Sequence, residues 1–515
     1  MSLGLFSGHP RGLITCFSIE LWERFSYYGM RALLIFFLTR HLLFSDAQGY
    51  LIYGTYAAMG YLMAVFGGVL ADRYLGARKA INFGAVLLVL GHLGLAFEGP
   101  PAHAAWVNGI ETVSRDETYL YLFYLSLAAI VTGVGILKTS TTTLVGALYA
   151  LDDPRRDAGF TIYYLGINIG GATAPLLCGW IGHTWGWKYG FMLAGFGMLF
   201  GLVTFRLGQR HLLNLAEPPA AARLGERVLG IVRREWLVYL ASIGVVGLVW
   251  LVIQHASLVG TLLTVTAIVV TCYVLYYAFA RCRRSERDRL LACGILIVFT
   301  VGFWAFYEQM GSSLNVFADR FVDRRVLGYE IPASMLQGLP SIFVILLAPL
   351  FSVLWLTLGR RGRAPSTAVK FSAAIFQLGL AFAVLAFGTS LAGEGSKVGF
   401  GWFVLNFLLL VTGELCLAPV GQSMVTRLAP RRIGGLMMGC FLLAYAGSSY
   451  MSGLIAQTTA GAASSVIIEN RAAGLDQYIA VYYRLGLLAS GVALVLLIMA
   501  PALKRLSHEN VGRET

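Results

Sequence analysis

Fourteen long apolar runs constrain this chain more than any other feature of its 515 residues. Each run approaches or exceeds the roughly 20 residues that a helix needs to cross the hydrocarbon core of a bilayer. A segment that crosses lipid by itself must be helical, because only a helix satisfies its own backbone hydrogen bonds. The pattern predicts an all-α, multi-pass membrane protein. The runs lie near residues 13–40, 49–71, 80–97, 119–149, 159–183, 189–206, 236–254, 259–280, 290–316, 333–358, 368–391, 398–426, 434–458 and 478–503.

The composition excludes several other classes of protein. Apolar residues make up 57% of the chain and charged residues only 13%, whereas soluble domains carry about 25% charged residues. A soluble enzyme and a disordered chain are therefore excluded. The seven cysteines are scattered and form no Cys-x-x-Cys pair, so we expect neither a metal site nor a set of disulfides. No cofactor is predicted.

The basic residues indicate an orientation in the membrane. Fourteen spans place both termini on one side, and the loops of that side hold 27 of the 39 Lys and Arg residues, against 8 on the other side. Cytoplasmic loops carry such an excess. We therefore expect a cell (inner) membrane protein with both termini in the cytoplasm. Because the loops account for most of the net charge of +13, no nucleic-acid partner is predicted.

A polar, Pro/Ala-rich segment at about 207–235 interrupts the series of spans. Two further spans and a very basic stretch follow it. The predicted division is a six-helix bundle at 11–206, a cytoplasmic linker with two extra spans at 207–285, and a second six-helix bundle at 286–505. Two similar halves around a site at the membrane midplane are typical of transporters.

The first span carries charges that lipid would not tolerate. At helical spacing, Glu20, Arg24, Tyr27 and Arg31 fall on one stripe. Because each charge costs about 2.5–3.5 kcal/mol at the centre of a membrane helix, the stripe must face protein or water. Glu20 and Glu23 lie at the right spacing to neutralise Arg24, which is an ordinary structural role. Arg31 has no carboxylate three or four positions away and needs a partner from elsewhere, either protein or ligand.

The fourth span carries a lone Lys138 close to Gly133 and Gly135. Small residues of this kind indicate close approach of neighbouring helices. A single lysine among them favours a functional role.

Two later spans carry buried acids. In the ninth run, at 290–316, Trp304, Glu308, Gly311 and Asn315 fall on a second stripe at helical spacing. Glu414 lies inside the twelfth run.

The intramembrane charges divide unevenly between the two halves. The first half sums to +1 and the second to −2. A short zwitterion fits this division, with its carboxylate toward Arg31 and Lys138 and its ammonium toward Glu414. Burial favours the protonated form of a carboxylate, so the charges alone predict proton-coupled uptake.

Several segments resemble a known family. Residues 68–79, GVLADRYLGARK, are similar to the loop motif of the major facilitator superfamily. Residues 20–28, ELWERFSYY, resemble the E-x-x-E-R-F-x-Y-Y signature of the proton-dependent oligopeptide transporters, and 159–170 and 413–430 resemble two further segments of that family. The matches extend from about residue 11 to residue 505. The pair of spans at 236–280 resembles the two additional helices of bacterial members.

The resemblance implies a major facilitator fold of two six-helix bundles plus two inserted helices. It implies symport of di- and tripeptides with protons by alternating access, in a monomer with no cofactor. Peptide-binding roles fall on Arg31 and Lys138 for the carboxylate, Glu414 for the amino group, Asn168 for the backbone, and Tyr27, Tyr28, Tyr61, Tyr164 and Trp304 for the side-chain pockets. Proton-coupling roles fall on Glu20, Glu23 and Glu308, with Arg24 paired to the first two.

Four positions depart from the family pattern. Thr139 follows Lys138 where members usually have Pro, which leaves the bending of that helix open. Gly54 stands where some members carry His, so no His-based proton step is expected there. Pro340 replaces a common Asn, and Phe441 replaces a common Trp.

Other functions remain as alternatives. Related transporters handle nitrate and other solutes, so an anion or amine substrate is one alternative. A membrane enzyme is disfavoured, because the sequence shows no Ser/His/Asp set, metal cluster or nucleotide-binding loop. A passive channel is disfavoured because charges of both signs divide between two walls instead of forming one like-charged ring.

Overall fold

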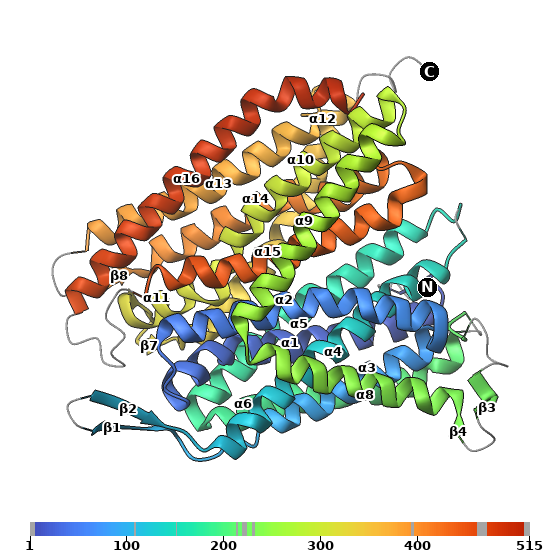
Figure 1. The fold of residues 1–515 in the computed structure, drawn as a ribbon. Helices are drawn as coiled ribbons and strands as arrows, with labels where there is room; N and C mark the ends of the chain where they lie inside the picture. Colours follow the sequence, from blue (N-terminus) through green and yellow to red (C-terminus); the bar gives the residue numbers. More distant parts are fainter. Residues whose placement is uncertain are drawn as a thin grey trace. The chain divides into compact units, whose positions relative to one another are not determined.

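The computed structural model describes residues 6–107, 110–150, 152–212, 215–218, 224–228, 232–392, 396–460 and 471–508. Figure 1 shows that long helices dominate these residues. They are α1 (Gly12–Phe36), α2 (Asp46–Leu70), α3 (Gly76–Leu95), α4 (Glu117–Ala147), α5 (Arg156–Trp185), α6 (Trp187–Gly208), α8 (Arg234–Ile253), α9 (Ala256–Ala280), α10 (Arg284–Tyr307), α12 (Leu339–Arg360), α13 (Thr367–Ser390), α14 (Phe400–Leu428), α15 (Gly434–Gln457) and α16 (Arg471–Leu506). A short helix, α11 (Ser313–Phe321), follows α10. The predicted all-α, multi-pass class is confirmed.

Twelve helical stretches among the described residues are long and apolar enough to cross a membrane. This number is smaller than the predicted fourteen for two reasons. Helices α2 and α3 form one continuous stretch, Asp46–Leu95, through the π-helix Ala71–Leu75. Helix α1 is not among the twelve; it carries Glu20, Glu23, Arg24 and Arg31, and charge excludes a stretch from this class.

The chain divides into two compact units. Unit 1 comprises residues 1–44, 59–256 and 334–341, and unit 2 comprises 45–58, 257–333 and 342–515. Helix α2 therefore contributes its first half to unit 2 and its second half to unit 1. The inserted helix α8 belongs to unit 1 and α9 to unit 2. The bundle boundaries predicted at 206/207 and 285/286 stay a prediction, and parts of the predicted linker lie outside the described residues.

In unit 1, α1 packs against α5 and α6, and α3 packs against α4. Glycines permit the close contacts that the sequence predicted around Lys138. A Cβ on Gly133 would lie 2.7 Å from the carbonyl oxygen of Gly84, and a Cβ on Gly135 would lie 2.4 Å from the backbone of Met63. Helix α4 is thus held between α2 and α3 by direct backbone contact. It runs without a break past Thr139, whose hydroxyl donates to the carbonyl of Gly135.

In unit 2, α13 packs against α14 and α16, and α10 packs against α15. The first half of α2 is joined to this unit by polar contacts. Arg320 donates to both carboxylate oxygens of Asp46, and the buried hydroxyls of Tyr50 and Tyr478 lie 2.9 Å apart. These contacts make the beginning of α2 part of the unit 2 core.

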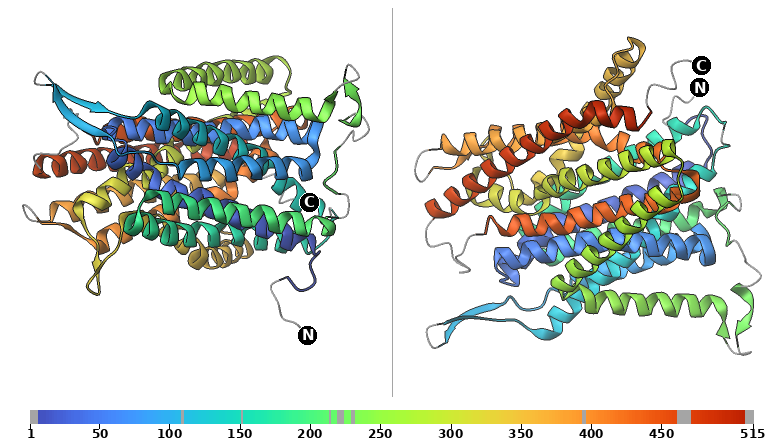
Figure 2. Two further views of the ribbon diagram at one scale, coloured as in Figure 1. Left: turned by 90° about the horizontal axis from the view of Figure 1, so that it is seen from below. Right: turned by 45° about the horizontal axis from the view of Figure 1, so that its top comes forward.

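Short strand pairs connect some of the helices and were not predicted. The longest, β1 (His103–Val107) and β2 (Ile110–Ser114), are antiparallel, with Ala105 opposite Thr112; Figure 2 shows this hairpin projecting beyond α3 and α4. The others are β3 (Arg227–Val228) with β4 (Val232–Arg233), β6 (Arg325–Val326) with β7 (Tyr329–Glu330), both antiparallel, and β5 (Val322–Asp323) parallel to β8 (Val398–Gly399).

The span predicted over 290–316 lies within one membrane-crossing stretch, Arg284–Phe321, but this stretch is not an unbroken α-helix. Helix α10 ends at Tyr307, a 3₁₀ turn covers Glu308–Gly311, and Ser312 has φ −119° and ψ −98°, outside the helical region. The chain enters α11 only at Ser313. Asn315, which follows the break, therefore does not share the helical stripe of Trp304 and Glu308, which stay one turn apart at the end of α10. A tertiary contact accompanies this break. The side chain of Gln309 is fully buried and donates hydrogen bonds to Ser452 of α15.

Candidate functional site

The charged residues of α1 form one buried cluster in unit 1. Arg24 donates from Nε to Glu23 Oε2 at 2.5 Å and from Nη2 to Glu23 Oε1 at 2.8 Å. Its Nε also lies 3.4 Å from Glu20 Oε1, one helical turn earlier. Glu20, Glu23 and Arg24 are 1%, 0% and 5% exposed. The predicted pairing of Arg24 with both acids is confirmed, and it explains how α1 carries these charges in a membrane.

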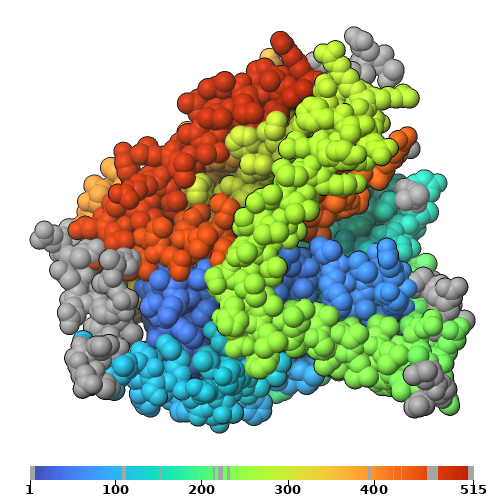
Figure 3. Space-filling view, viewed as in Figure 1, coloured from blue at the N-terminus to red at the C-terminus, as the bar shows by residue number. Residues whose placement is uncertain are grey.

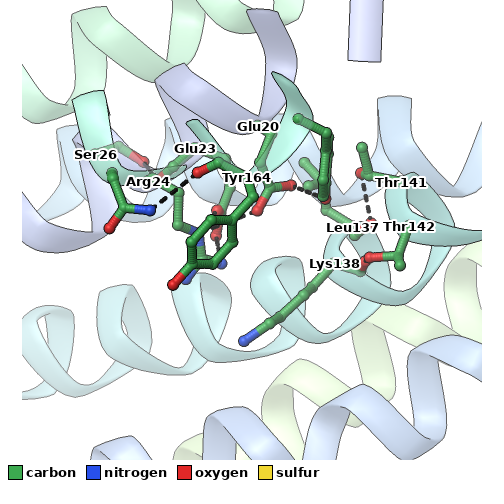
Figure 4. A network of polar contacts seen from close by, with 11 residues as sticks. Glu20, Glu23, Arg24, Ser26, Leu137, Lys138, Thr141, Thr142 and Tyr164 are labelled. Carbon is green, nitrogen blue, oxygen red and sulfur yellow. Dashed lines mark hydrogen bonds and ion pairs between the residues drawn. The ribbon is translucent and has the colours of Figure 1, made fainter. Parts of the chain in front are cut away.

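The cluster extends to the neighbouring helices α4 and α5, as Figure 4 shows. Tyr163 of α5, which is buried, donates its hydroxyl hydrogen to Glu20 Oε2 at 2.6 Å. Lys138 of α4 is close enough to Glu23 for their charges to attract. With Lys138 included, the cluster holds two acids and two bases, so its formal charge is balanced within unit 1.

Several predicted binding residues surround this cluster. Lys138 Nζ lies 5.2 Å from the centre of the Tyr61 ring, and the Arg24 guanidinium lies 5.3 Å from the Tyr27 ring, both within cation–π range. In Figure 4 the side chains of Arg24, Lys138 and Tyr164 extend toward the same side of the network. Tyr164 is 44% exposed. Tyr61 and Tyr27 therefore each lie beside one cation of the cluster.

The other predicted residues of unit 1 differ in their exposure to solvent. Tyr28 and Arg31 are partly exposed and lie on the same helix as the cluster. Asn168 is 7% exposed, and its amide donates to the carbonyl of Tyr164 in its own helix at 3.0 Å. The amide nitrogen of Asn168 is thus engaged within α5.

The acids of unit 2 are arranged differently. Tyr307, the last residue of α10, donates its hydroxyl hydrogen to Glu414 of α14. Within unit 2, no described Lys, Arg or His forms an ion pair with Glu414. Glu308 is near enough for the two carboxylates to repel each other. The described hydrogen-bond partner of Glu414 is therefore a neutral phenol.

Aromatic rings surround these acids. The Trp304 ring lies 5.0 Å from the rings of both Tyr307 and Tyr445. Trp304 is 8% exposed, and among the described residues its indole nitrogen has no hydrogen-bond partner. Trp304 thus packs against the tyrosine that is bonded to Glu414.

The 3₁₀ turn that carries Glu308 is fastened to α15. The Gln309 amide donates to the carbonyl and the hydroxyl of Ser452 at 3.0 and 3.1 Å, and its oxygen accepts from Ser313 at 2.7 Å. Gln309 is fully buried. The position of Glu308 is therefore determined by a tertiary contact of the next residue.

Sequence reasoning missed three residues of these networks: Tyr163, Tyr307 and Gln309. Tyr163 directly precedes the predicted Tyr164, and Tyr307 directly precedes Glu308. The sequence signal for both tyrosines was their position next to a predicted residue, together with a hydroxyl that can donate a hydrogen bond. Nothing in the sequence says which of two adjacent tyrosines points toward a carboxylate.

The described residues contain no group of three or more His, Cys, Asp or Glu side chains arranged to hold a metal. All seven cysteines are free thiols.

Comparison with known proteins identifies the family. The sequence model of the POT family matches residues 78–473, more than half of the chain. The chain belongs to the POT family. The peptide transporter YePEPT of Yersinia enterocolitica subsp. palearctica is similar to this POT chain, with 35% identity over 526 aligned positions that cover 99% of this chain and 98% of YePEPT.

Solved structures of POT proteins are similar over nearly the whole chain. A crystal structure of peptide transporter POT in complex with sulfate aligns with a TM-score of 0.80 and 31% identity, and covers 97% of this chain and 96% of that one. A POT family transporter in complex with 5-aminolevulinic acid aligns with a TM-score of 0.79 and 28% identity, with coverage of 97% and 98%. The predicted major facilitator fold is therefore confirmed. As a POT family member the chain is a membrane transporter and not an enzyme.

Proposed function

We propose that this POT protein imports di- and tripeptides together with protons by alternating access. It does so in the inner membrane, as a monomer with both termini in the cytoplasm, and with the proton as its only coupling ion. Membership of the POT family supports this proposal, as does the similarity to YePEPT, which is named a peptide transporter.

The distribution of charge between the units carries the proposal. Unit 1 presents cations beside aromatic rings, and unit 2 holds Glu414 with a neutral partner. A short peptide is a zwitterion that supplies one charge of each sign. Its carboxylate binds Arg31 and Lys138, and its ammonium group binds Glu414. Asn168 contacts the peptide backbone, and the side-chain pockets are lined by Tyr27, Tyr28, Tyr61, Tyr164 and Trp304.

Protons enter the cycle through the acids that the peptide does not bind. Glu308 takes up a proton with the peptide, and Glu20, Glu23 and Arg24 rearrange their pairing as the transporter changes conformation. The three-acceptor arrangement around Arg24 supports this role, because protonation of one acid still leaves the guanidinium paired with the other.

The proposal includes the division of the chain. Residues 11–206 and 286–505 act as the two moving bundles, and 207–285 is a linker with two extra helices. The two compact units differ from this division at three places. The first half of α2 belongs to unit 2, residues 334–341 belong to unit 1, and the inserted helices α8 and α9 fall one to each unit.

One further class of substrate is supported by an observation. A similar POT transporter was solved with 5-aminolevulinic acid, a small molecule with an amine and a carboxylate. The same pair of charges would hold it. Competition by unlabelled dipeptide and by 5-aminolevulinic acid against labelled peptide measures which class this protein prefers.

Uptake by proteoliposomes tests the proposal. With a pH gradient, acid outside, the wild-type protein is expected to accumulate a labelled dipeptide. Glu308→Gln is expected to abolish accumulation while it retains exchange of peptide down its own gradient. Asp157→Asn, an exposed acid in the first turn of α5, is the matched control and should behave as wild type. Retained accumulation by Glu308→Gln would remove Glu308 from the coupling step, and absence of any peptide uptake by the wild type would refute the peptide assignment.

A further inference from the structure

The inserted helix α9 carries an exposed apolar stripe along its full length. From Leu258 to Phe279, residues at intervals of three and four point away from the protein. The Leu, Val, Tyr and Phe side chains among them are 43% to 65% exposed. The stripe comprises Leu258, Leu262, Val265, Val269, Cys272, Tyr276 and Phe279. In Figure 3 the region of the chain that contains α9 lies on the visible surface. The opposite side of α9 packs on unit 2, where Gly260 lies against the Tyr450 ring.

The length of this stripe matches a bilayer. Its 21-residue separation from Leu258 to Phe279 corresponds to about 31 Å at 1.5 Å per residue, and a hydrocarbon core is about 30 Å thick. Tyr276 lies near its end, and tyrosine favours the lipid–water interface. The residues that follow Phe279 therefore lie at the level of lipid headgroups.

Those following residues are strongly basic. Between Arg281 and Arg289 the chain has five arginines and two acids. Arg281, Arg284 and Arg289 are exposed, and their side chains make no ion pair or hydrogen bond to other described residues. Arg432, in the 3₁₀ turn just before α15, adds a further exposed cation near Cys282.

One of the two acids of this stretch is paired with an arginine, and the other caps the beginning of α10. Glu286 accepts a hydrogen bond from the backbone nitrogen of Arg283, and Asp288 pairs with Arg287 at 3.1 Å. The Arg287 guanidinium also lies 5.7 Å from the Phe279 ring, so this arginine joins the basic turn to the end of the apolar stripe. Five arginines against two acids leave this stretch with a net charge of +3 at headgroup level.

We propose that the α9–α10 turn is a binding site for an anionic phospholipid. Arg281, Arg284, Arg289 and Arg432 bind the headgroup phosphate, and the acyl chains lie along the stripe of α9. Arginine is suited to phosphate because its planar fork donates two parallel hydrogen bonds. Each cation near an anionic membrane surface strengthens lipid binding about fivefold. This inference does not depend on the transported substrate.

Lipid retention by the purified full-length protein tests the site. The protein in neutral detergent is incubated with phosphatidylglycerol or phosphatidylcholine, and bound lipid is counted by native mass spectrometry. We expect phosphatidylglycerol to bind preferentially and to be displaced by salt. The combined variant Arg281→Gln, Arg284→Gln and Arg289→Gln is expected to weaken this binding about a hundredfold.

A matched control removes the same charge elsewhere. Arg210→Gln, Arg227→Gln and Arg233→Gln together delete three exposed arginines of the segment between α6 and α8, and phosphatidylglycerol binding should stay at the wild-type level. Equal loss in both variants, or equal retention of phosphatidylcholine, would overturn the proposal. So would displacement of the lipid by millimolar inorganic phosphate, because the site would then bind a free anion. The salt and phosphate arms use the wild-type protein, so they decide the question even if a variant fails to fold.

Discussion

The two units bury carboxylates in opposite ways. In unit 1, Glu20 and Glu23 share the guanidinium of Arg24, and each acid of the cluster has a cation within 3.4 Å. In unit 2, Glu414 is bonded to the hydroxyl of Tyr307. A cluster that its own chain neutralises is complete without a ligand, whereas a carboxylate held by a neutral group can still receive a cation. The comparison therefore separates acids that are paired with a cation of their own unit from an acid that the ammonium group of a ligand can still neutralise.

Removal of Arg24 should produce the largest effect, because it strands two buried acids. Arg24→Gln is expected to cost about 3–5 kcal/mol of stability, as for other buried pairs that lose one partner. Thermal unfolding of the purified protein in detergent measures this loss. Arg24→Lys keeps the charge but not the two parallel hydrogen bonds, and should fall between the variant and the wild type. An unchanged unfolding temperature for Arg24→Gln would show that the acids of unit 1 do not need their cation.

Removal of the charge on Glu414 should affect the ligand and spare the fold. Glu414→Gln strands no cation within unit 2, so its unfolding temperature should match the wild type. Loss of a charge-assisted bond to a peptide ammonium is expected to raise the KM for dipeptides about tenfold or more. Uptake kinetics check this, with an N-acetylated dipeptide as a substrate whose KM should not change.

The corresponding Glu→Gln substitution in unit 1 is expected to affect stability instead of ligand binding. Glu23→Gln removes the acid that binds Arg24 through two bonds and should lower the unfolding temperature. If Glu414→Gln destabilises as much as Glu23→Gln, then the two units do not differ in the way proposed.

The two tyrosines sharpen the comparison at a smaller scale. Tyr163→Phe removes a donor from Glu20, which keeps Arg24 as a partner, and should cost about 1 kcal/mol of stability. Tyr307→Phe removes the hydroxyl from Glu414 and should shift the KM for dipeptides by several-fold, because the carboxylate loses the group that orients it. Unfolding and uptake are measured for both variants. Identical effects of the two substitutions on KM would contradict the assignment of Glu414 to the ligand.

The smallest effect is expected for a pair outside the membrane. Arg78 donates two hydrogen bonds to Glu217, at 2.7 and 2.9 Å, and holds the pKa of Glu217 below its ordinary value. A lowered folded-state pKa means that the pair stabilises the protein above the unfolded value of about 4.3 and that this stability is lost as pH falls through the folded value.

Glu217→Gln should therefore lower stability by less than about 1 kcal/mol near neutral pH, because both side chains are substantially exposed. The difference from wild type should vanish at acid pH, as measured by unfolding across a pH series. Glu226→Gln, whose partner Arg234 lies 3.7 Å away, is the control and should show a smaller difference. A Glu217→Gln effect that persists below the folded pKa would point to packing and not to charge.

Much of the first unit could be predicted from local sequence. Glu20 and Arg24 are one helical turn apart, so their contact follows from helix geometry alone. Gly133 and Gly135 beside Lys138 indicated the backbone contacts that hold α4. The break after Glu308 could not be predicted in this way, because Gln309 finds its partner in Ser452, more than a hundred residues later.

Gly54 illustrates the same limit. The sequence showed that glycine stands at a position where some members of the family carry His. The reason is tertiary: a Cβ there would lie 2.8 Å from the carbonyl oxygen of Ser449 and 2.9 Å from the Cα of Gly453. In this packing α2 and α15 approach too closely for any larger residue.

The sequence by itself determined the helical membrane class and which charges lie inside the spans, because hydropathy and helical periodicity are local properties. It also determined the pairing of Arg24 with Glu20. Only the tertiary structure decided which tyrosine meets each acid, where α10 breaks, and that α2 is divided between two units. Those outcomes depend on side chains from distant segments that meet only after the helices have packed.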